Sequence, residues 1–139
     1  MGMTIGEVAR RAGCTPPTIR YYESIGLLPL AARTAKGRRT FGWPEVQRLA
    51  FIRRAREFGL SVEDVRELLA GQDAASGQAC SVAVSVVEKH LVEVRAKRSE
   101  LKRLEASLTS MLDRCRSGCA AGAAEACSIF ADIDSASQP

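Results

Sequence analysis

A stretch of 34 residues without glycine or proline is the feature that most limits what this chain can fold into. It runs from Ser81 to Arg114, and apolar side chains recur along it at steps of three and four. The apolar positions are Val84, Val87, Leu91, Val94, Leu101, Leu104, Leu108 and Met111. This is a heptad repeat with one change of phase between Leu101 and Leu104, and it predicts a single helix about 50 Å long.

A helix of that length cannot bury its whole apolar stripe against the rest of a chain of 139 residues. An intramolecular helical hairpin is the alternative, but the sequence offers no second helix of comparable length. Because an isolated amphipathic helix gains most of its stability from packing, we expect the stripe to face a copy of itself in a second chain. The sequence therefore predicts a homodimer.

The chain before this helix begins with signals of two short helices joined by a tight turn. Thr4 and Glu7 have the spacing of a capping box, and Gly13 is placed to end the helix that follows. Thr15 and Pro16 then predict the start of a second helix, in which Arg20 and Tyr21 can reach base edges and phosphates. This layout predicts a helix-turn-helix.

A basic hairpin and two more helices complete the predicted head of the molecule. The turn signal Lys36-Gly37 lies between Arg33 and the pair Arg38-Arg39, so the hairpin could lie along a DNA backbone as a wing. Two further helices are expected to begin at Trp43-Pro44 and after Ser61. The prediction is a mainly α fold with four parts: a winged helix-turn-helix over 1–70, a linker over 71–80, the long helix over 81–114, and a cysteine loop with a tail over 115–139.

The distribution of charge supports a nucleic-acid partner for the head. Residues 1–70 hold 12 Lys and Arg against 7 Asp and Glu, whereas residues 71–139 hold 8 against 9. No apolar run approaches the length of a membrane span, and no signal peptide opens the chain. We therefore expect a cytoplasmic protein with no membrane partner.

Five cysteines in a protein of the reducing cytoplasm favour metal binding, thiol redox sensing or simple burial over disulfides. Cys80 starts the long helix, Cys115 ends it, and Cys119 and Cys127 follow. Thiolates select soft ions such as Zn(II), Cd(II), Hg(II), Pb(II) and Cu(I). Cys14, in the predicted turn, is interpreted as a buried residue. With a single histidine and no His-Glu pair, an enzyme is not expected.

The head also resembles a known family. The motifs Thr4-Ile5-Gly6-Glu7-Val8-Ala9, Thr18-Ile19-Arg20-Tyr21-Tyr22-Glu23 and Gly26-Leu27-Leu28 are similar to those of MerR-family transcriptional regulators. Gly37, Arg39 and Phe41 match the family's wing pattern, and residues 53–61 match its second helical pair. The resemblance covers about residues 3–115.

The resemblance implies a homodimer held by an antiparallel coiled coil of the long helices. It also implies that two winged heads bind promoter DNA, and that the activated dimer distorts this DNA so that RNA polymerase can use it. Val8, Ile19, Leu28, Leu49 and Phe58 are interpreted as core. The residues that match the family's DNA contacts are Thr18, Arg20 and Tyr21 in the recognition helix, Arg38 and Arg39 in the wing, and Arg53 and Arg56 beside the backbone.

An antiparallel dimer would bring Cys80 of one chain close to Cys115, Cys119 and Cys127 of its partner. Within the family, a cysteine at the position of Cys80 is typical of sensors of divalent ions, so the resemblance implies a soft divalent metal (Zn, Cd, Hg or Pb) bound at the dimer interface. The expected function is activation of metal-resistance or efflux genes. The alternatives are a monovalent copper-type sensor, because the loop spacing resembles theirs, and a thiol-based redox sensor.

Overall fold

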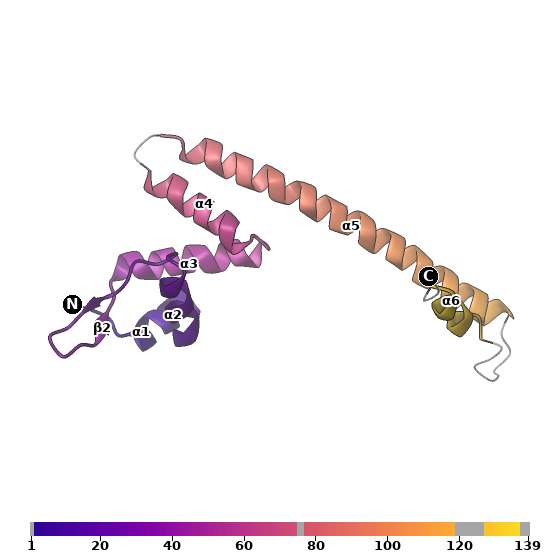
Figure 1. The fold of residues 1–139 in the computed structure, drawn as a ribbon, viewed down its shortest axis with the longest axis horizontal. Helices are drawn as coiled ribbons and strands as arrows, with labels where there is room; N and C mark the ends of the chain where they lie inside the picture. The colour runs from indigo at the N-terminus through magenta and orange to yellow at the C-terminus, as the bar shows by residue number, and fades with distance from the viewer. Residues whose placement is uncertain (1, 75–76, 119–126, 137–139) are drawn as a thin grey trace. The chain divides into compact units, whose positions relative to one another are not determined.

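The computed structural model describes residues 2–74, 77–118 and 127–136, and the chain divides into two compact units, Met1–His90 and Leu91–Pro139. We call the first the head and the second the distal unit. The elements, in chain order, are α1 (Ile5–Ala12), α2 (Pro16–Ser24), β1 (Ala32–Arg33), β2 (Arg39–Thr40), α3 (Trp43–Glu57), α4 (Val62–Asp73), α5 (Ala79–Gly118) and α6 (Ser128–Ala136). The predicted mainly α fold with a small hairpin and a long helix is confirmed (Figure 1).

The short helices of the head begin and end at the predicted signals. Thr4 Oγ1 accepts a hydrogen bond from the Glu7 backbone N–H at 3.3 Å, and Glu7 Oε2 accepts one from the Thr4 N–H at 2.7 Å. Gly13 then ends α1 with φ of +72°, a conformation that costs glycine little. Thr15 caps α2, which has Pro16 at its first position. The α1–α2 turn is therefore set by local sequence.

The wing is a two-stranded antiparallel hairpin tied to the start of the chain. Ala32 pairs with Thr40 and Arg33 with Arg39. A third backbone segment joins it, because Met3 and Phe41 exchange two backbone hydrogen bonds of 2.7 and 2.9 Å. Phe41 is buried, so the base of the wing is part of the head's core.

Two apolar clusters, each containing residues of α3, hold the head together. The first cluster consists of Val8, Ala9, Ala12, Ile19, Leu28, Phe41, Val46 and Leu49. The second consists of Leu27, Ile52, Ala55, Leu60, Val65, Leu69 and Val86. Four of the five expected core residues, Val8, Ile19, Leu28 and Leu49, are buried as predicted.

The fifth expected core residue, Phe58, is a correction, because its side chain is 79% exposed. Phe58 is the C-cap of α3, where the helix ends and the chain turns. Gly59, with φ of +82°, reverses the direction of the chain and places Leu60 in the core instead. The sequence predicts Phe58 in the core because it has the apolar spacing of α3. The last buried position of the helix is Ala55, one turn earlier.

The first turns of α5 belong to the head and are fixed to it by apolar and polar contacts. Val86 is fully buried in the second cluster, and Val82 packs beside it. Lys89 Nζ lies 2.9 Å from Oδ1 of the buried Asp64 on α4. His90 Nε2 lies 2.8 Å from the Phe58 carbonyl oxygen, so this nitrogen donates the bond. His90 thus joins α5 to the end of α3.

The long helix extends beyond its expected bounds of 81–114, since α5 starts at Ala79 and ends at Gly118. A second difference lies in the expected cysteine loop, where α6 occupies Ser128–Ala136. Ile129 and Ile133 have i, i+4 spacing in α6, and Arg114 of α5 binds Asp132 through both carboxylate oxygens. Among the described residues, no helix is long and apolar enough to cross a membrane.

Candidate nucleic-acid interface and metal-ligand cysteines

The outer side of α2 carries three of the residues predicted to contact DNA. Ile19 is buried, and Arg20 and the half-exposed Tyr21, which follow it along the helix, lie on the surface. Thr18 is half-buried, and its hydroxyl lies 2.9 Å from that of Thr15 in the helix cap. Arg20 is therefore exposed on α2, and it makes no ion pair with any described residue.

The two tyrosines of α2 divide their roles. Tyr22 is half-buried and packs against both apolar clusters, whereas Tyr21 is 50% exposed. Their rings are 5.7 Å apart and inclined at 46°. Tilted aromatic pairs of this kind are favourable, so Tyr22 holds Tyr21 in place at the surface. Tyr22 is therefore the packed tyrosine of the pair, and Tyr21 is the exposed one.

The two wing arginines differ in their surroundings. Arg38 is exposed, while Arg39 is half-buried and its Nε lies 3.5 Å from Oε1 of Glu23 on α2. The hairpin turn is held by Arg33, which donates to the Gly37 carbonyl at 2.8 Å. A hollow of about 310 Å³ between the wing and the start of α1 is lined by Thr4, Ile5, Arg33, Arg38 and Arg39.

Arg53 and Arg56, predicted to contact the DNA backbone, both have partners inside the head. Arg53 donates to the Ala12 carbonyl at the end of α1 (3.0 Å) and to Glu57 (2.7 Å). Arg56 donates to the Leu60 carbonyl at 2.7 Å. A guanidinium has five N–H donors, so these contacts leave some available for phosphate. Arg53 thus ties α3 to the end of α1, and Arg56 ties α3 to the turn that follows it, whether or not they touch DNA.

The structure brings three of the predicted DNA residues to one hollow of about 270 Å³. Thr18, Arg53 and Arg56 line it together with Cys14, Tyr22, Leu49 and Glu57. Cys14 is half-buried against the first cluster, in accord with its interpretation as a packing residue. Burial raises the pKa of its thiol, and the charge of Arg53 opposes this only in part. Cys14 is therefore poorly suited to bind a metal as a thiolate.

Glu23 is the residue of this face that the sequence analysis missed. It is almost fully buried, and its Oε2 accepts a hydrogen bond from the Ala31 N–H at 3.1 Å. A signal was present, since Glu23 lies four residues after the buried Ile19 and so shares its inward face. A carboxylate at such a position requires a cationic or N–H partner nearby.

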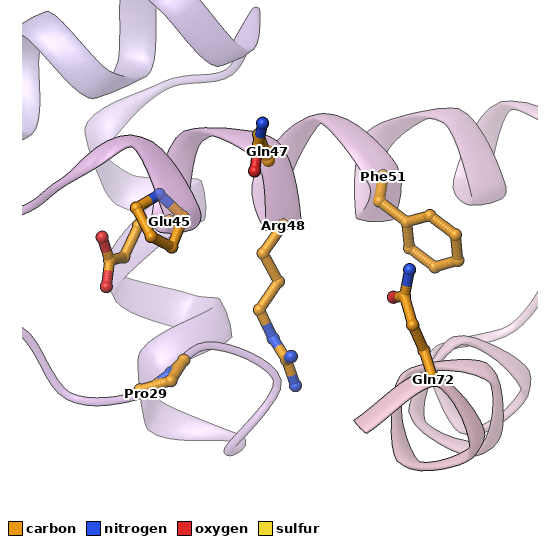
Figure 2. A pocket seen from close by; sticks show the side chains of 7 residues that line it. Pro29, Glu45, Gln47, Arg48, Phe51 and Gln72 are labelled. Carbon is orange, nitrogen blue, oxygen red and sulfur yellow. The ribbon is translucent and has the colours of Figure 1, made fainter. Parts of the chain in front are cut away.

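A further pocket, of about 390 Å³, lies away from every predicted site residue (Figure 2). Figure 2 shows Arg48 extending from α3 between Pro29 and Gln72. Its Nε donates to the Leu27 carbonyl at 2.8 Å, and its Nη1 binds the Asp73 carboxylate at 2.9 and 3.2 Å. Arg48 thus joins α3 to α4 and to the chain after α2, which is a structural role.

The predicted metal ligands lie at the two ends of α5 and at the start of α6. Cys80 is exposed in the first turn of α5, Cys115 is half-buried in its last turn, and the half-buried Cys127 directly precedes α6. Cys119 lies outside the described residues. The described residues contain no group of three His, Cys, Asp or Glu side chains that could hold a metal ion.

The three described cysteines divide between the two ends of α5. Cys80 and Cys115 are separated by roughly 50 Å of helical rise, so one chain cannot bring both to one ion while α5 is helical. The Arg114–Asp132 contact holds α6 to the end of α5. Cys115 and Cys127 therefore belong to the same end of the distal unit, with exposed Cys80 accessible to a second chain.

Comparison with known proteins identifies the family. The model of the MerR HTH family regulatory protein matches residues 3–72, and the MerR DNA-binding model matches residues 46–111. The HTH-type transcriptional regulator ZntR of Escherichia coli (strain K12) is 40% identical over 111 residues, which cover 80% of this chain and 79% of the relative.

Two solved structures are similar over nearly the whole chain. The transcription regulator PbrR691 of Ralstonia metallidurans CH34, in complex with lead(II), is 35% identical with a TM-score of 0.81, covering 94% of this chain and 98% of that one. The MerR regulator of Bacillus megaterium MB1, in complex with mercury(II), is 26% identical with a TM-score of 0.72, covering 94% and 99%. The chain belongs to the MerR family of helix-turn-helix regulatory proteins, which are transcriptional regulators and not enzymes.

Proposed function

We propose that this protein is a metal-responsive transcriptional regulator that binds promoter DNA as a homodimer and takes up a soft divalent ion through cysteine thiolates. The single observation that carries the proposal is the placement of Cys80 and Cys115 in the first and last turns of one 40-residue helix. Two chains in antiparallel orientation would bring these two cysteines together, and a single chain would not.

The proposed dimer is supported by the exposure of the apolar stripe on α5. Among its members, Leu91 is 42% exposed, Leu101 65% and Leu104 54% in the isolated chain. A stripe of this length would be an unusual surface for a monomer, because it repeats over the whole helix. Burying it against a second α5 is the simplest way to cover it, and an antiparallel pairing also places Cys80 next to the partner's end of α5.

The proposed ligands are Cys80 of one chain with Cys115, Cys119 and Cys127 of the other. Sulfur ligands favour soft ions, and the family relatives solved with lead(II) and mercury(II) support a divalent ion over copper. When bound, the ion would supply a link between the start of one α5 and the end of the other. A monovalent copper-type sensor and a thiol redox sensor are the alternatives, and the titration below separates them.

The proposed DNA contacts are Thr18, Arg20 and Tyr21 from α2, Arg38 and Arg39 from the wing, and Arg53 and Arg56 from α3. In the metal-bound state the dimer would distort the promoter so that RNA polymerase can start transcription of metal-resistance or efflux genes. This activity would take place in the cytoplasm, where the DNA is. The exposed guanidiniums of Arg20 and Arg38 support the contact with DNA most directly.

A metal titration of the reduced protein tests this proposal. We expect Zn(II), Cd(II), Pb(II) or Hg(II) to bind with a stoichiometry of one ion per chain. The thiolate-to-metal absorption band monitors the binding. Cys80→Ser should weaken binding by more than about a hundredfold, since it removes a direct ligand. The matched control is Cys14→Ser, which should bind as the wild type does.

Two other results would replace the proposal with its alternatives. Tight Cu(I) binding that is unaffected by Cys80→Ser would make the protein a copper-type sensor. If the protein binds no metal tightly, and mild oxidation changes transcription from the promoter that it regulates, it would be a thiol redox sensor.

A further inference from the structure

The head contains an ion pair between the recognition helix and the wing, in which the carboxylate is buried and the guanidinium is half-buried. Glu23, on α2, has 3% of its side chain exposed, and its Oε1 lies 3.5 Å from Nε of Arg39 in β2. The other oxygen, Oε2, accepts a hydrogen bond from the Ala31 N–H, just before β1. The carboxylate of Glu23 therefore links α2, the helix expected to read the DNA, to both strands of the wing. It contacts Ala31 just before β1 and Arg39 in β2.

This pair is hard to separate, because Glu23 has no second ion-pair partner among the residues that the structure describes. Within the described residues, Oε1 accepts no hydrogen bond, and Arg39 is the basic side chain paired with it. If Arg39 moved away to a DNA phosphate, a buried carboxylate would lose its counter-charge, which is strongly unfavourable. Keeping Arg39 beside Glu23 when DNA binds avoids this cost, and its charge is then already balanced by the carboxylate.

The neighbouring Arg38 is in a different situation. Its side chain is exposed, it lines the hollow beside the start of α1, and its guanidinium has no ion pair with a described residue. The backbone of Arg38 is fixed by Thr34, which donates to its carbonyl at 2.8 Å and accepts from its N–H at 3.2 Å. Arg38 thus combines a rigid backbone with an available charge, as a phosphate contact requires.

We infer that Glu23 and Arg39 are positioning residues that hold the wing to the recognition helix, and that Arg38 is the wing arginine whose charge neutralises a DNA phosphate. This inference rests on the proposed DNA-binding function and refines it. It assigns a role to Glu23, and it gives Arg39 the role of positioning the wing with a charge that Glu23 already balances.

The salt dependence of DNA binding distinguishes the two arginines. Each phosphate neutralised contributes about 0.9 to the slope of log K against log salt concentration, so Arg38→Gln should reduce the slope by roughly 1.8 per dimer. Arg39→Gln should weaken binding by about tenfold at one salt concentration and leave the slope unchanged, because its charge is already balanced by Glu23. The probe is a mixed-sequence DNA duplex of about 30 base pairs, or three helical turns.

The double variant provides the rescue test. Removing both members of a buried pair is much less costly than removing one, so Glu23→Gln combined with Arg39→Gln should recover most of the affinity lost in Arg39→Gln alone. A slope that falls as much in Arg39→Gln as in Arg38→Gln would overturn the inference. So would a double variant that binds no better than Arg39→Gln.

Thermal unfolding without DNA tests the ion pair independently. Arg39→Gln should lower the Tm by roughly 4–8 °C, and the added Glu23→Gln should restore part of it. Absence of this rescue overturns the positioning role whatever the DNA result. If the wild-type protein does not bind the duplex, the proposed function fails, and with it the phosphate role of Arg38.

Discussion

The head and the distal unit differ in how much of their apolar surface they bury within one chain. In the head, residues from five helices and the wing enclose two clusters, with side chains such as Val8, Ile19 and Ile52 fully buried. In the distal unit, Leu101, Leu104 and Leu108 are all more than half exposed. The head is therefore stable by its own packing, whereas the distal unit has a surface that requires a partner.

The largest expected effect comes from a charge in the stripe of the distal unit. Leu104→Asp removes a leucine from both chains of a dimer and places two like charges in the interface, so dimer formation should weaken by about 4 kcal/mol or more. Sedimentation equilibrium at micromolar concentration should then find a monomer. The matched control, Lys102→Asp, changes a residue off the stripe and should leave the dimer intact.

If Leu104→Asp remained a dimer with the wild-type dissociation constant, the exposed stripe would not be the interface. The comparison between the two units would then fail, because both would have to be self-sufficient. Leu104→Asp should leave the thermal unfolding of the head unchanged, because the two clusters of the head contain no residue beyond Val86.

A core deletion in the head is the next largest effect. Ile52 is fully buried between α3 and α4, so Ile52→Ala should cost about 2–5 kcal/mol of unfolding free energy. Phe58→Ala, six residues later, should stay within about 0.5 kcal/mol because Phe58 is 79% exposed. Urea denaturation monitored by circular dichroism measures both. Equal losses in the two variants would mean that Phe58 is covered in the assembled protein.

The starts and ends of the helices could be predicted because they depend on neighbouring residues. Thr4, Thr15 and Ser61 act through hydrogen bonds to residues three positions away, and Gly13 acts through its own backbone. The heptad pattern is likewise local, because it depends only on the spacing of apolar residues along one helix. Such features need no knowledge of the rest of the fold.

The features that the sequence did not predict are contacts that depend on distant parts of the chain. Nothing near Phe58 shows that the core has already ended at Ala55, and nothing near Arg53 shows that the Ala12 carbonyl will lie within 3.0 Å. Glu23 and Arg39 pair across 16 positions for the same reason. The sequence predicts a loop where α6 lies, because alanine and glycine dominate the composition of the tail before it.

The smallest expected effect lies where α5 leaves the head, at the pair formed by Asp64 and Lys89. The Lys89 ammonium lowers the pKa of the Asp64 carboxyl below its ordinary value, with help from the N–H and hydroxyl of Ser61, while burial opposes this. Because the folded pKa is below the unfolded one, the pair stabilises the protein above the unfolded pKa of about 3.9, and this contribution is lost as the pH falls through the folded value.

Asp64→Asn should therefore cost about 1 kcal/mol at neutral pH, a modest loss because Lys89 is half exposed. As the pH falls below 4, the wild type and the variant should approach the same stability, since the wild-type carboxyl becomes protonated; urea titrations at a series of pH values measure this. Glu67→Gln is the control, because that carboxylate is exposed and lies 4.0 Å from the same ammonium. A constant difference between Asp64→Asn and wild type at every pH would assign the effect to the helix cap at Ser61. Convergence at low pH would assign it to the charge that joins α5 to the head.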